Sequence, residues 1–216
     1  MLFVFVAKND IADISDKIPL SEYRKRKIDA TWHEDIKRGR RAAGVLLSYA
    51  LKRCFGLDDS TLQYAEEDLG KPFLIGQPNV HFNISHTDGY CAVAVADSHV
   101  GVDIQLIDRE MSERRLRVAE RYFSEAEFEL SGLMEDPSLF YRLWTAKESA
   151  VKCTGEGLSM GIRRFYFPAD IKRGRCGDMF FSALDIDEYA MTVCTFVEED
   201  PIVEHVSASD ILGGSV

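Results

Sequence analysis

The sequence predicts an α+β fold, because strand-like and helix-like segments occur in separate runs along the chain rather than in strict alternation. One observation is a strand-rich stretch at residues 62–106, where short β-branched segments are separated by Gly and Pro. A second is the helical periodicity of residues 113–153, and a third is the return of strand-like patterns at residues 165–196. With 216 residues, 46% of them hydrophobic, the chain is long enough for one large or two small packed units.

The first predicted element is a strand at residues 2–7. This apolar run has no basic leader and is too short for a signal sequence or a membrane span, so we expect a cytoplasmic protein without membrane association. A helix is predicted over residues 36–54, where Leu47 and Leu51 follow the helical period before Gly56 ends it. Four strands are expected next, the second and third forming a meander or hairpin: residues 62–65, 81–84, 90–96 and 100–106.

Helix signals dominate the following segment, with predicted helices at residues 113–122, from Ser124 onward and at 137–153. Ser124 and Glu127 have the spacing of a capping box. Asp136 is predicted to cap the third helix, Pro137 to occupy its first turn and Gly155 to end it. Strands are then expected at residues 165–167, 179–186 and 189–196.

The net charge of −10 argues against general nucleic-acid binding, which needs a cationic surface. The charge is uneven, however, because residues 24–41 contain eight Lys or Arg against three Asp or Glu. This basic segment is either the solvated face of a helix or a surface for an anion or an acidic partner. The five cysteines are odd in number and lack a Cys-x-x-Cys pair, which favours free thiols in a reducing cytoplasm.

Four polar residues combine oxygen ligands with a cation, and the functional hypothesis depends on their occurring together. Asp103 and Gln105 alternate onto one side of a predicted strand. Glu148 and Lys152 stand one turn apart on a predicted helix. Such groups can hold a hard divalent cation against a phosphate, so the combination suggests phosphoryl chemistry. Taken singly, each has a structural explanation, such as a turn aspartate, an exposed helix pair or, for His86, a loop histidine.

Four short segments carry a pattern in a fixed order: residues 70–72 (Gly-Lys-Pro), 82–87 (Phe-Asn-Ile-Ser-His-Thr), 101–105 (Gly-Val-Asp-Ile-Gln) and 144–152 (Trp-Thr-Ala-Lys-Glu-Ser-Ala-Val-Lys). Together they resemble the signature motifs of the 4′-phosphopantetheinyl transferases of the surfactin-synthetase-activating type, in register from about Ser21 to Phe167. The resemblance implies transfer of the phosphopantetheine arm of coenzyme A to a serine of an apo acyl or peptidyl carrier protein. Adenosine 3′,5′-bisphosphate would be released.

The resemblance also implies roles for individual residues. The implied ligands of a magnesium ion, or of manganese in its place, are Asp103, Gln105 and Glu148. Glu148 would also take the proton of the acceptor serine, and Lys152 would act beside it as a catalytic residue by stabilising the phosphates. The residues implied to hold the phosphates of coenzyme A are Arg40 (for the 3′-phosphate), Lys71, Ser85, His86 and Lys152.

One position departs from the pattern, because many members carry a glutamate where this chain has Gln105. An amide oxygen is a neutral ligand, so magnesium should bind less tightly in the absence of the donor, and a water can replace Gln105. Lys147 also lies within a motif, and we expect it on the helix surface or in contact with the coenzyme. Trp144 is expected to anchor the helix through its apolar area.

The fold implied by the resemblance has two similar α+β halves related by a pseudo-twofold axis, with the active site in the cleft between them. The halves would be residues 1–98 and 99–216, joined by the polar turn at residues 97–99, and such a chain could act as a monomer. Two alternatives remain open. One is a metal-dependent phosphohydrolase, which would need a richer acidic cluster. The other is a non-catalytic module that binds coenzyme A or carrier proteins, with Gln105 as a mark of decay.

Overall fold

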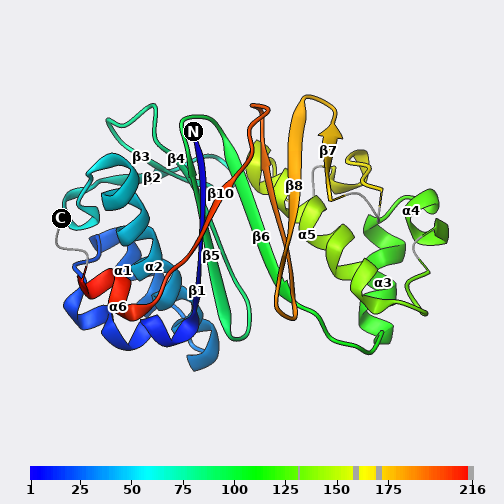
Figure 1. The fold of residues 1–216 in the computed structure, drawn as a ribbon, viewed down its shortest axis with the longest axis horizontal. Helices are drawn as coiled ribbons and strands as arrows, with labels where there is room; N and C mark the ends of the chain where they lie inside the picture. The colour runs from blue at the N-terminus through cyan, green and yellow to red at the C-terminus, as the bar shows by residue number, and fades with distance from the viewer. Residues whose placement is uncertain (131, 158–160, 169–171, 214–216) are drawn as a thin grey trace.

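The computed structural model describes residues 1–130, 132–157, 161–168 and 172–213. Two four-stranded sheets lie back to back, a two-stranded hairpin lies beside the first sheet, and helices cover the outer faces (Figure 1). This arrangement confirms the α+β class. Among the described residues, no helix combines the length and apolar character needed to span a bilayer.

The first sheet has the strand order β10-β1-β5-β4. Its members are β1 (Leu2–Lys8), β4 (His81–His86), β5 (Tyr90–Ala96) and β10 (Ile202–His205). The predicted hairpin is confirmed, because β4 and β5 pair antiparallel across Gly89, whose positive φ of 81° suits the turn. Strand β10 pairs in parallel with β1, so the end of the described chain returns to its beginning.

Helical segments cover the outer face of the first sheet. They are η1 (Asn9–Lys17), α1 (Glu22–Asp29), α2 (Glu34–Phe55), η2 (Asp59–Thr61) and α6 (Ala208–Gly213), with the hairpin β2 (Tyr64–Glu66) and β3 (Pro72–Leu74) beside them. Helix α2 ends at Gly56 with a left-handed φ of 66°, as predicted. The helical segments η1 and α1 were not predicted from the sequence; α1 is strongly charged and buries only Arg24 and Ile28.

The second sheet has the order β6-β9-β8-β7. Its strands are β6 (Val100–Leu106), β7 (Arg173–Cys176), β8 (Met179–Ile186) and β9 (Tyr189–Thr195), and its helical segments are α3 (Glu113–Tyr122), α4 (Glu125–Leu130), α5 (Pro137–Thr154) and η4 (Ile162–Arg164). The strand predicted at residues 165–167 is wrong, since this segment is irregular. Its alternating pattern arises because Phe165 and Phe167 are buried in the core while Tyr166 is exposed.

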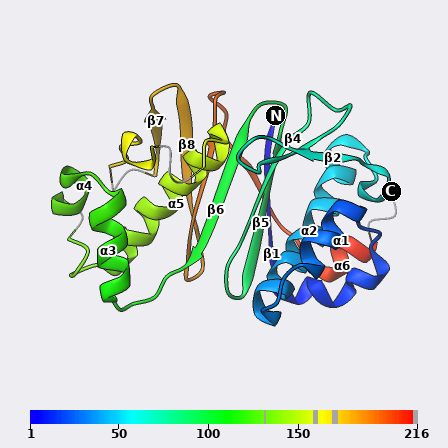
Figure 2. The ribbon, with the colours of Figure 1, turned by 180° about the vertical axis from the view of Figure 1, so that it is seen from behind.

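Alternation along the strands separates three layers of core. In β1, Phe5 and Ala7 pack against α2, whereas Val4 and Val6 face the second sheet. The same alternation lets Ile104 of β6 join the core between the sheets. A third cluster lies between the second sheet and α5. The order of layers is therefore helices, sheet, sheet, helices, and the view from behind shows the same arrangement (Figure 2).

The chain passes from the first sheet to the second through the bend at residues 97–99, between β5 and β6. This is where the sequence places the division between residues 1–98 and 99–216. However, β10 and α6 lie with the first sheet although they belong to the second range. Pairing of β10 with β1 joins residues about as distant as the chain permits, so no local pattern predicts it.

Candidate functional site

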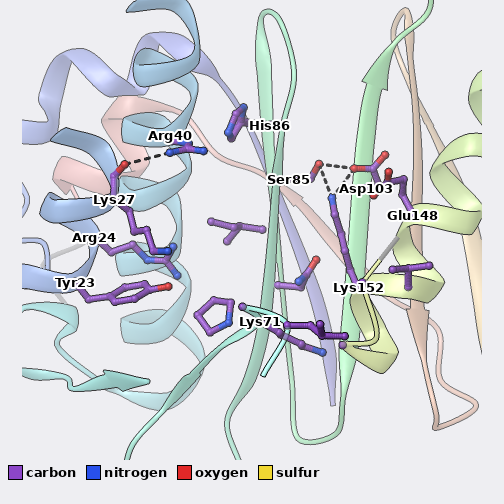
Figure 3. Close-up of a pocket in the computed structure, with 18 of the residues that line it drawn as sticks. Tyr23, Arg24, Lys27, Arg40, Lys71, Ser85, His86, Asp103, Glu148 and Lys152 are labelled. Carbon is purple, nitrogen blue, oxygen red and sulfur yellow. Dashed lines mark hydrogen bonds and ion pairs between the residues drawn. The ribbon is translucent and has the colours of Figure 1, made fainter. Parts of the chain in front are cut away.

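A cavity of about 610 Å³ opens between the two halves of the molecule. Its walls come from α1, α2 and β4 on one side and from β6 and α5 on the other (Figure 3). All eight site residues predicted from the sequence line it: Arg40, Lys71, Ser85, His86, Asp103, Gln105, Glu148 and Lys152. Side chains that lie far apart in the sequence therefore share one space.

Helix α5 lies directly on β6 because Gly101 has no side chain. A Cβ atom at Gly101 would come within 2.0 Å of the Ser149 carbonyl oxygen and 2.4 Å of the Cys153 nitrogen. Asp103 is two residues further along the strand, on the same face as Gly101. This close approach brings Asp103 next to the turn of α5 that carries Glu148 and Lys152 (Figure 3).

Asp103 is the centre of a polar network and is 2% exposed. Lys152 forms an ion pair with it, with 2.6 Å between Nζ and Oδ1. Ser85 donates to the same oxygen at 2.7 Å. The Gln105 amide donates from Nε2 to Oδ2 at 3.0 Å. Both oxygens of the carboxylate thus accept hydrogen bonds, and the lysine charge compensates the buried aspartate.

Glu148 has a carboxyl group that titrates near neutral pH. Burial first, and then the negative charge of Asp103, raise its pKa, the ammonium of Lys152 lowers it, and the net result is a pKa of about 7. A carboxylate with a pKa near the working pH is suited to accept a proton.

Asp103, Gln105 and Glu148 all line the cavity, and their oxygen atoms are the kind of ligand that a hard divalent cation prefers. The hydrogen bonds of Asp103 are compatible with this use, because Lys152 and the Gln105 amide are donors that a cation can displace. In the part of the chain that the structure describes, no three His, Cys, Asp or Glu side chains gather as a metal cluster. Asp103, Gln105 and Glu148 offer two carboxylates and one amide, a donor set whose chemistry would suit magnesium.

Lys71 and His86, both predicted to bind phosphate, are partly buried in the protein. Lys71 donates to the carbonyl oxygens of Val100 at 3.3 Å and Cys153 at 2.9 Å, and burial lowers the pKa of its ammonium. His86 is partly buried, and burial, followed by the charge of Arg40, lowers the pKa of its imidazole. Gly39 leaves room for His86, since a Cβ atom there would lie 3.0 Å from Nδ1.

The basic segment at residues 24–41 contributes three basic residues to the cavity, Arg24, Lys27 and Arg40. Arg40 lies at the rim and donates to the Lys27 carbonyl at 3.2 Å and to Thr31 Oγ1 at 2.8 Å. Arg24 is 6% exposed, and its guanidinium group lies 5.3–5.5 Å from the centres of three aromatic rings. Its Nε and Nη2 atoms have no hydrogen-bond partner among the described residues.

Four further polar residues line the cavity and were not predicted individually as site residues: Tyr23, Asn83, and Arg24 and Lys27 of the basic segment. Arg24 and Lys27 are three residues apart, so they lie on one face of α1. Recognising a helix at residues 22–29 in the sequence would have revealed this shared face. Tyr23 and Lys27 both contact Glu66 of β2, the lysine at 2.6 Å. Helix α1 is thereby held against the β2–β3 hairpin.

Lys147 lies neither on the helix surface nor in the cavity, so both expectations for it are wrong. Its side chain is fully buried and forms an ion pair with Glu127 at 2.9 Å. It also donates to the carbonyl oxygens of Phe165 and Ile162, at 2.5 and 3.4 Å. Trp144 packs against the core cluster of α5, as predicted.

Comparison with known proteins gives consistent matches. A family model described as the 4′-phosphopantetheinyl transferase superfamily matches residues 99–194, which include β6 and α5. A 4′-phosphopantetheinyl transferase of Bacillus subtilis is 30% identical over 149 residues, which cover 68% of this chain and 65% of that protein. One from Bacillus pumilus is 31% identical over 164 residues, which cover 73% of this chain and 68% of that protein.

A vertebrate protein is also similar over a shorter length. The L-aminoadipate-semialdehyde dehydrogenase-phosphopantetheinyl transferase of Xenopus laevis is 37% identical over 111 residues, covering 45% of this chain and 37% of that protein. The chain spans about two thirds of the length of the bacterial relatives, 65% for the Bacillus subtilis protein and 68% for the Bacillus pumilus protein.

Proposed function

The chain belongs to the 4′-phosphopantetheinyl transferase superfamily, and from this membership we propose that it transfers the phosphopantetheine arm of coenzyme A to a carrier protein. The acceptor is a serine hydroxyl of an apo acyl or peptidyl carrier protein, and adenosine 3′,5′-bisphosphate is released. One observation carries the proposal: a single cavity has a buried Asp103–Lys152 pair and the near-neutral Glu148 on one wall, and cations on the facing wall.

Coenzyme A carries a 3′-phosphate and a diphosphate, and two groups of cations in the cavity match these charges. We assign the 3′-phosphate to Arg24, whose buried guanidinium has unpaired donors, with Lys27 and Arg40 at the rim. The expectation from the sequence was a basic residue of the segment before Gly44, with Arg40 as the first choice, and the unpaired donors of Arg24 support adding that residue. The diphosphate is assigned to the remaining predicted set: Lys71, Ser85, His86 and Lys152.

A magnesium ion, or manganese in its place, is proposed to bind to Asp103, Gln105 and Glu148. When bound, it neutralises negative charge that develops on the diphosphate. Gln105 would use its amide oxygen, so the amide that now donates to Asp103 must turn over. At limiting magnesium, Gln105→Ala should be less active than the wild type; equal activity would show that Gln105 is not a ligand.

During the proposed transfer, residues of the chain accept the serine proton and stabilise the negative charge on the phosphate oxygens. The serine oxygen attacks the phosphorus atom that carries the pantetheine arm, and the bond from that phosphorus to the adenosine bisphosphate oxygen breaks. The serine proton passes to Glu148, directly or through a water. Lys152 leaves Asp103 to stabilise the phosphate oxygens as a point charge.

We further propose that residues 1–98 and 99–216 are two similar halves related by a pseudo-twofold axis, except that β10 and α6 complete the first half. In support, each half has a four-stranded sheet with a long helix packed on it, α2 in the first and α5 in the second. Each half supplies part of the cavity wall, which supports action as a monomer. The proposed location is the cytoplasm.

The test is to incubate the protein with coenzyme A, magnesium and an apo carrier domain and to measure the mass of the carrier. A transferase adds one phosphopantetheinyl group to the carrier. A phosphohydrolase consumes coenzyme A without modifying the carrier, and a non-catalytic binding module does neither. Either of the last two results with several carriers, at saturating magnesium, would contradict the proposal.

A further inference from the structure

The two sheets meet along a seam where side chains take the place of strand pairing. Strand β6 is at the edge of the second sheet, and β4 is at the edge of the first. Side chains of β4 and of the residue after it accept hydrogen bonds from backbone N–H groups of β6: Asn83 from Val102 at 2.9 Å, Ser85 from Ile104 at 3.3 Å and Thr87 from Leu106 at 3.4 Å. The acceptors alternate with the period of a strand, so one face of β4 lies along the edge of β6.

The carbonyl groups on the same edge of β6 are also bound by side chains. Lys71 donates to the Val100 oxygen at 3.3 Å, and Lys152 donates to the Val102 oxygen at 3.2 Å. A buried strand edge needs such partners, because an unpaired backbone N–H or C=O group away from water is costly. The term seam refers here to the contact between the side chains of Asn83, Ser85 and Thr87 and the backbone at the edge of β6.

Three of the five side chains at this edge, Ser85, Lys71 and Lys152, are assigned above to the donor phosphates. Ser85 also donates to Asp103, and Lys152 also pairs with it. These groups can change partners when a ligand binds, so they cannot by themselves keep β6 in register. Asn83 and Thr87 lie two residues before and after Ser85, and the side-chain oxygen of each accepts from the backbone of β6.

We propose that Asn83 and Thr87 are positioning residues for the transfer reaction. They hold β6 in register against β4, so that Asp103 stays opposite Ser85 and Lys152 while those two residues exchange partners. This inference rests on the proposed function. Thr87 does not line the cavity. Asn83 does line it, but its side-chain oxygen accepts from the Val102 N–H next to Asp103, so the proposed role of both residues is exerted through β6.

The test compares variants that lose the acceptor with a variant that keeps it. Asn83→Leu and Thr87→Val are close in size to the natural residues but cannot accept the N–H, whereas Thr87→Ser can. Val45→Ala is the control for stability alone, because Val45 is buried between α2 and the first sheet, away from β6. Measurements are kcat, the dissociation constant for coenzyme A and the melting temperature, with kinetics at a temperature where all variants are folded.

We expect kcat to fall by about tenfold or more in Asn83→Leu, and by less in Thr87→Val, because small misplacements of reacting groups are costly. Coenzyme A affinity should change by less than about threefold, since each half keeps its own binding groups. Thr87→Ser should recover the wild-type kcat, and Val45→Ala should lower the melting temperature without lowering kcat. Near-wild-type kcat in both acceptor-free variants, or an equal kcat loss in Val45→Ala, would overturn the inference.

Amide hydrogen exchange separates this inference from the proposed function. In Asn83→Leu the Val102 amide should exchange faster than in the wild type, while amides paired between β8 and β9 should not change. If the wild-type protein transfers nothing to any carrier, the proposed function is overturned. Hydrogen exchange alone then tests whether Asn83 and Thr87 hold β6 in register against β4. An unchanged exchange rate of the Val102 amide would overturn this inference as well, and faster exchange confined to β6 would support it.

Discussion

At the scale of single residues, Glu148 links burial to chemistry most directly. Its pKa of about 7 should appear as the midpoint of a carboxyl titration followed by NMR in the protein alone. Asp103→Asn should lower this midpoint by removing a nearby negative charge, and Lys152→Met should raise it. Because only the carboxylate accepts a proton, kcat/KM should fall as pH decreases through this range.

The stability effect of Glu148 has the opposite dependence on pH. The folded pKa of about 7 is above the ordinary glutamate value of 4.5, so the folded state binds more protons than the unfolded state between these two pH values. The contribution to stability is therefore full below about pH 4.5 and is lost as pH rises through about 7. Glu148→Gln should thus stabilise the fold at pH 8 and change it little at pH 4. A Glu148 midpoint near 4.5, with no pH-dependent difference in stability, would contradict this account.

Arg24 should determine whether the 3′-phosphate is recognised. Arg24→Met keeps most of the packing against the aromatic rings but removes the charge, so KM for coenzyme A should rise by about tenfold or more. KM for dephospho-coenzyme A, which lacks that phosphate, should change little. Arg26→Met is the matched control, because Arg26 is an exposed arginine of α1 outside the cavity. If Arg24→Met raised KM equally for coenzyme A and for dephospho-coenzyme A, Arg24 would not be the residue that recognises the 3′-phosphate.

At the scale of elements, the contact of α5 with β6 depends on Gly101. Gly101→Ala would place a methyl group 2.0 Å from a backbone oxygen that cannot move alone, so α5 must shift away from Asp103. We expect a loss of stability of about 1–3 kcal/mol or more and a loss of most activity. Gly213→Ala, where the added atom meets nothing within 4 Å, should behave as the wild type in denaturant unfolding and in transfer. A fully active Gly101→Ala would refute the required contact.

The buried pair of Lys147 and Glu127 connects α5 to α4 and to the segment after η4. Glu127 also accepts from the Phe167 nitrogen at 2.9 Å and from the Ser124 nitrogen at 2.8 Å. Glu127→Gln leaves a buried ammonium without its counter-ion, so we expect about 3–5 kcal/mol of destabilisation in urea unfolding. The double variant Glu127→Leu with Lys147→Met should recover much of this loss. A double variant no more stable than Glu127→Gln would contradict the explanation.

Elements with strong local signals were predictable from the sequence. Helix α5 begins and ends where Asp136, Pro137 and Gly155 indicate, and the reciprocal capping bonds of Ser124 and Glu127 are confirmed. Helix α1 was not predicted, because its apolar pattern is weak and its stability comes from packing on α2 and the β2–β3 hairpin.

At the scale of the whole molecule, the chain carries a net charge of −10 but gathers cations along one wall of the cavity. The motifs predicted which residues share the cavity, because their types and spacing suit one chemistry. They could not predict the burial of Arg24 or of Lys147, since both depend on elements distant in the sequence. The seam between β4 and β6 and the return of β10 to β1 are likewise long-range features.

The central claim is that this cavity holds coenzyme A with a divalent cation between the two halves. The most direct measurement is a crystal structure with coenzyme A and manganese, in which anomalous scattering locates the metal. We predict one metal peak that Asp103 and Glu148 both coordinate, in contact with the diphosphate, with the 3′-phosphate against Arg24. A metal bound elsewhere, or Asp103 and Glu148 too far apart to share it, would contradict the account.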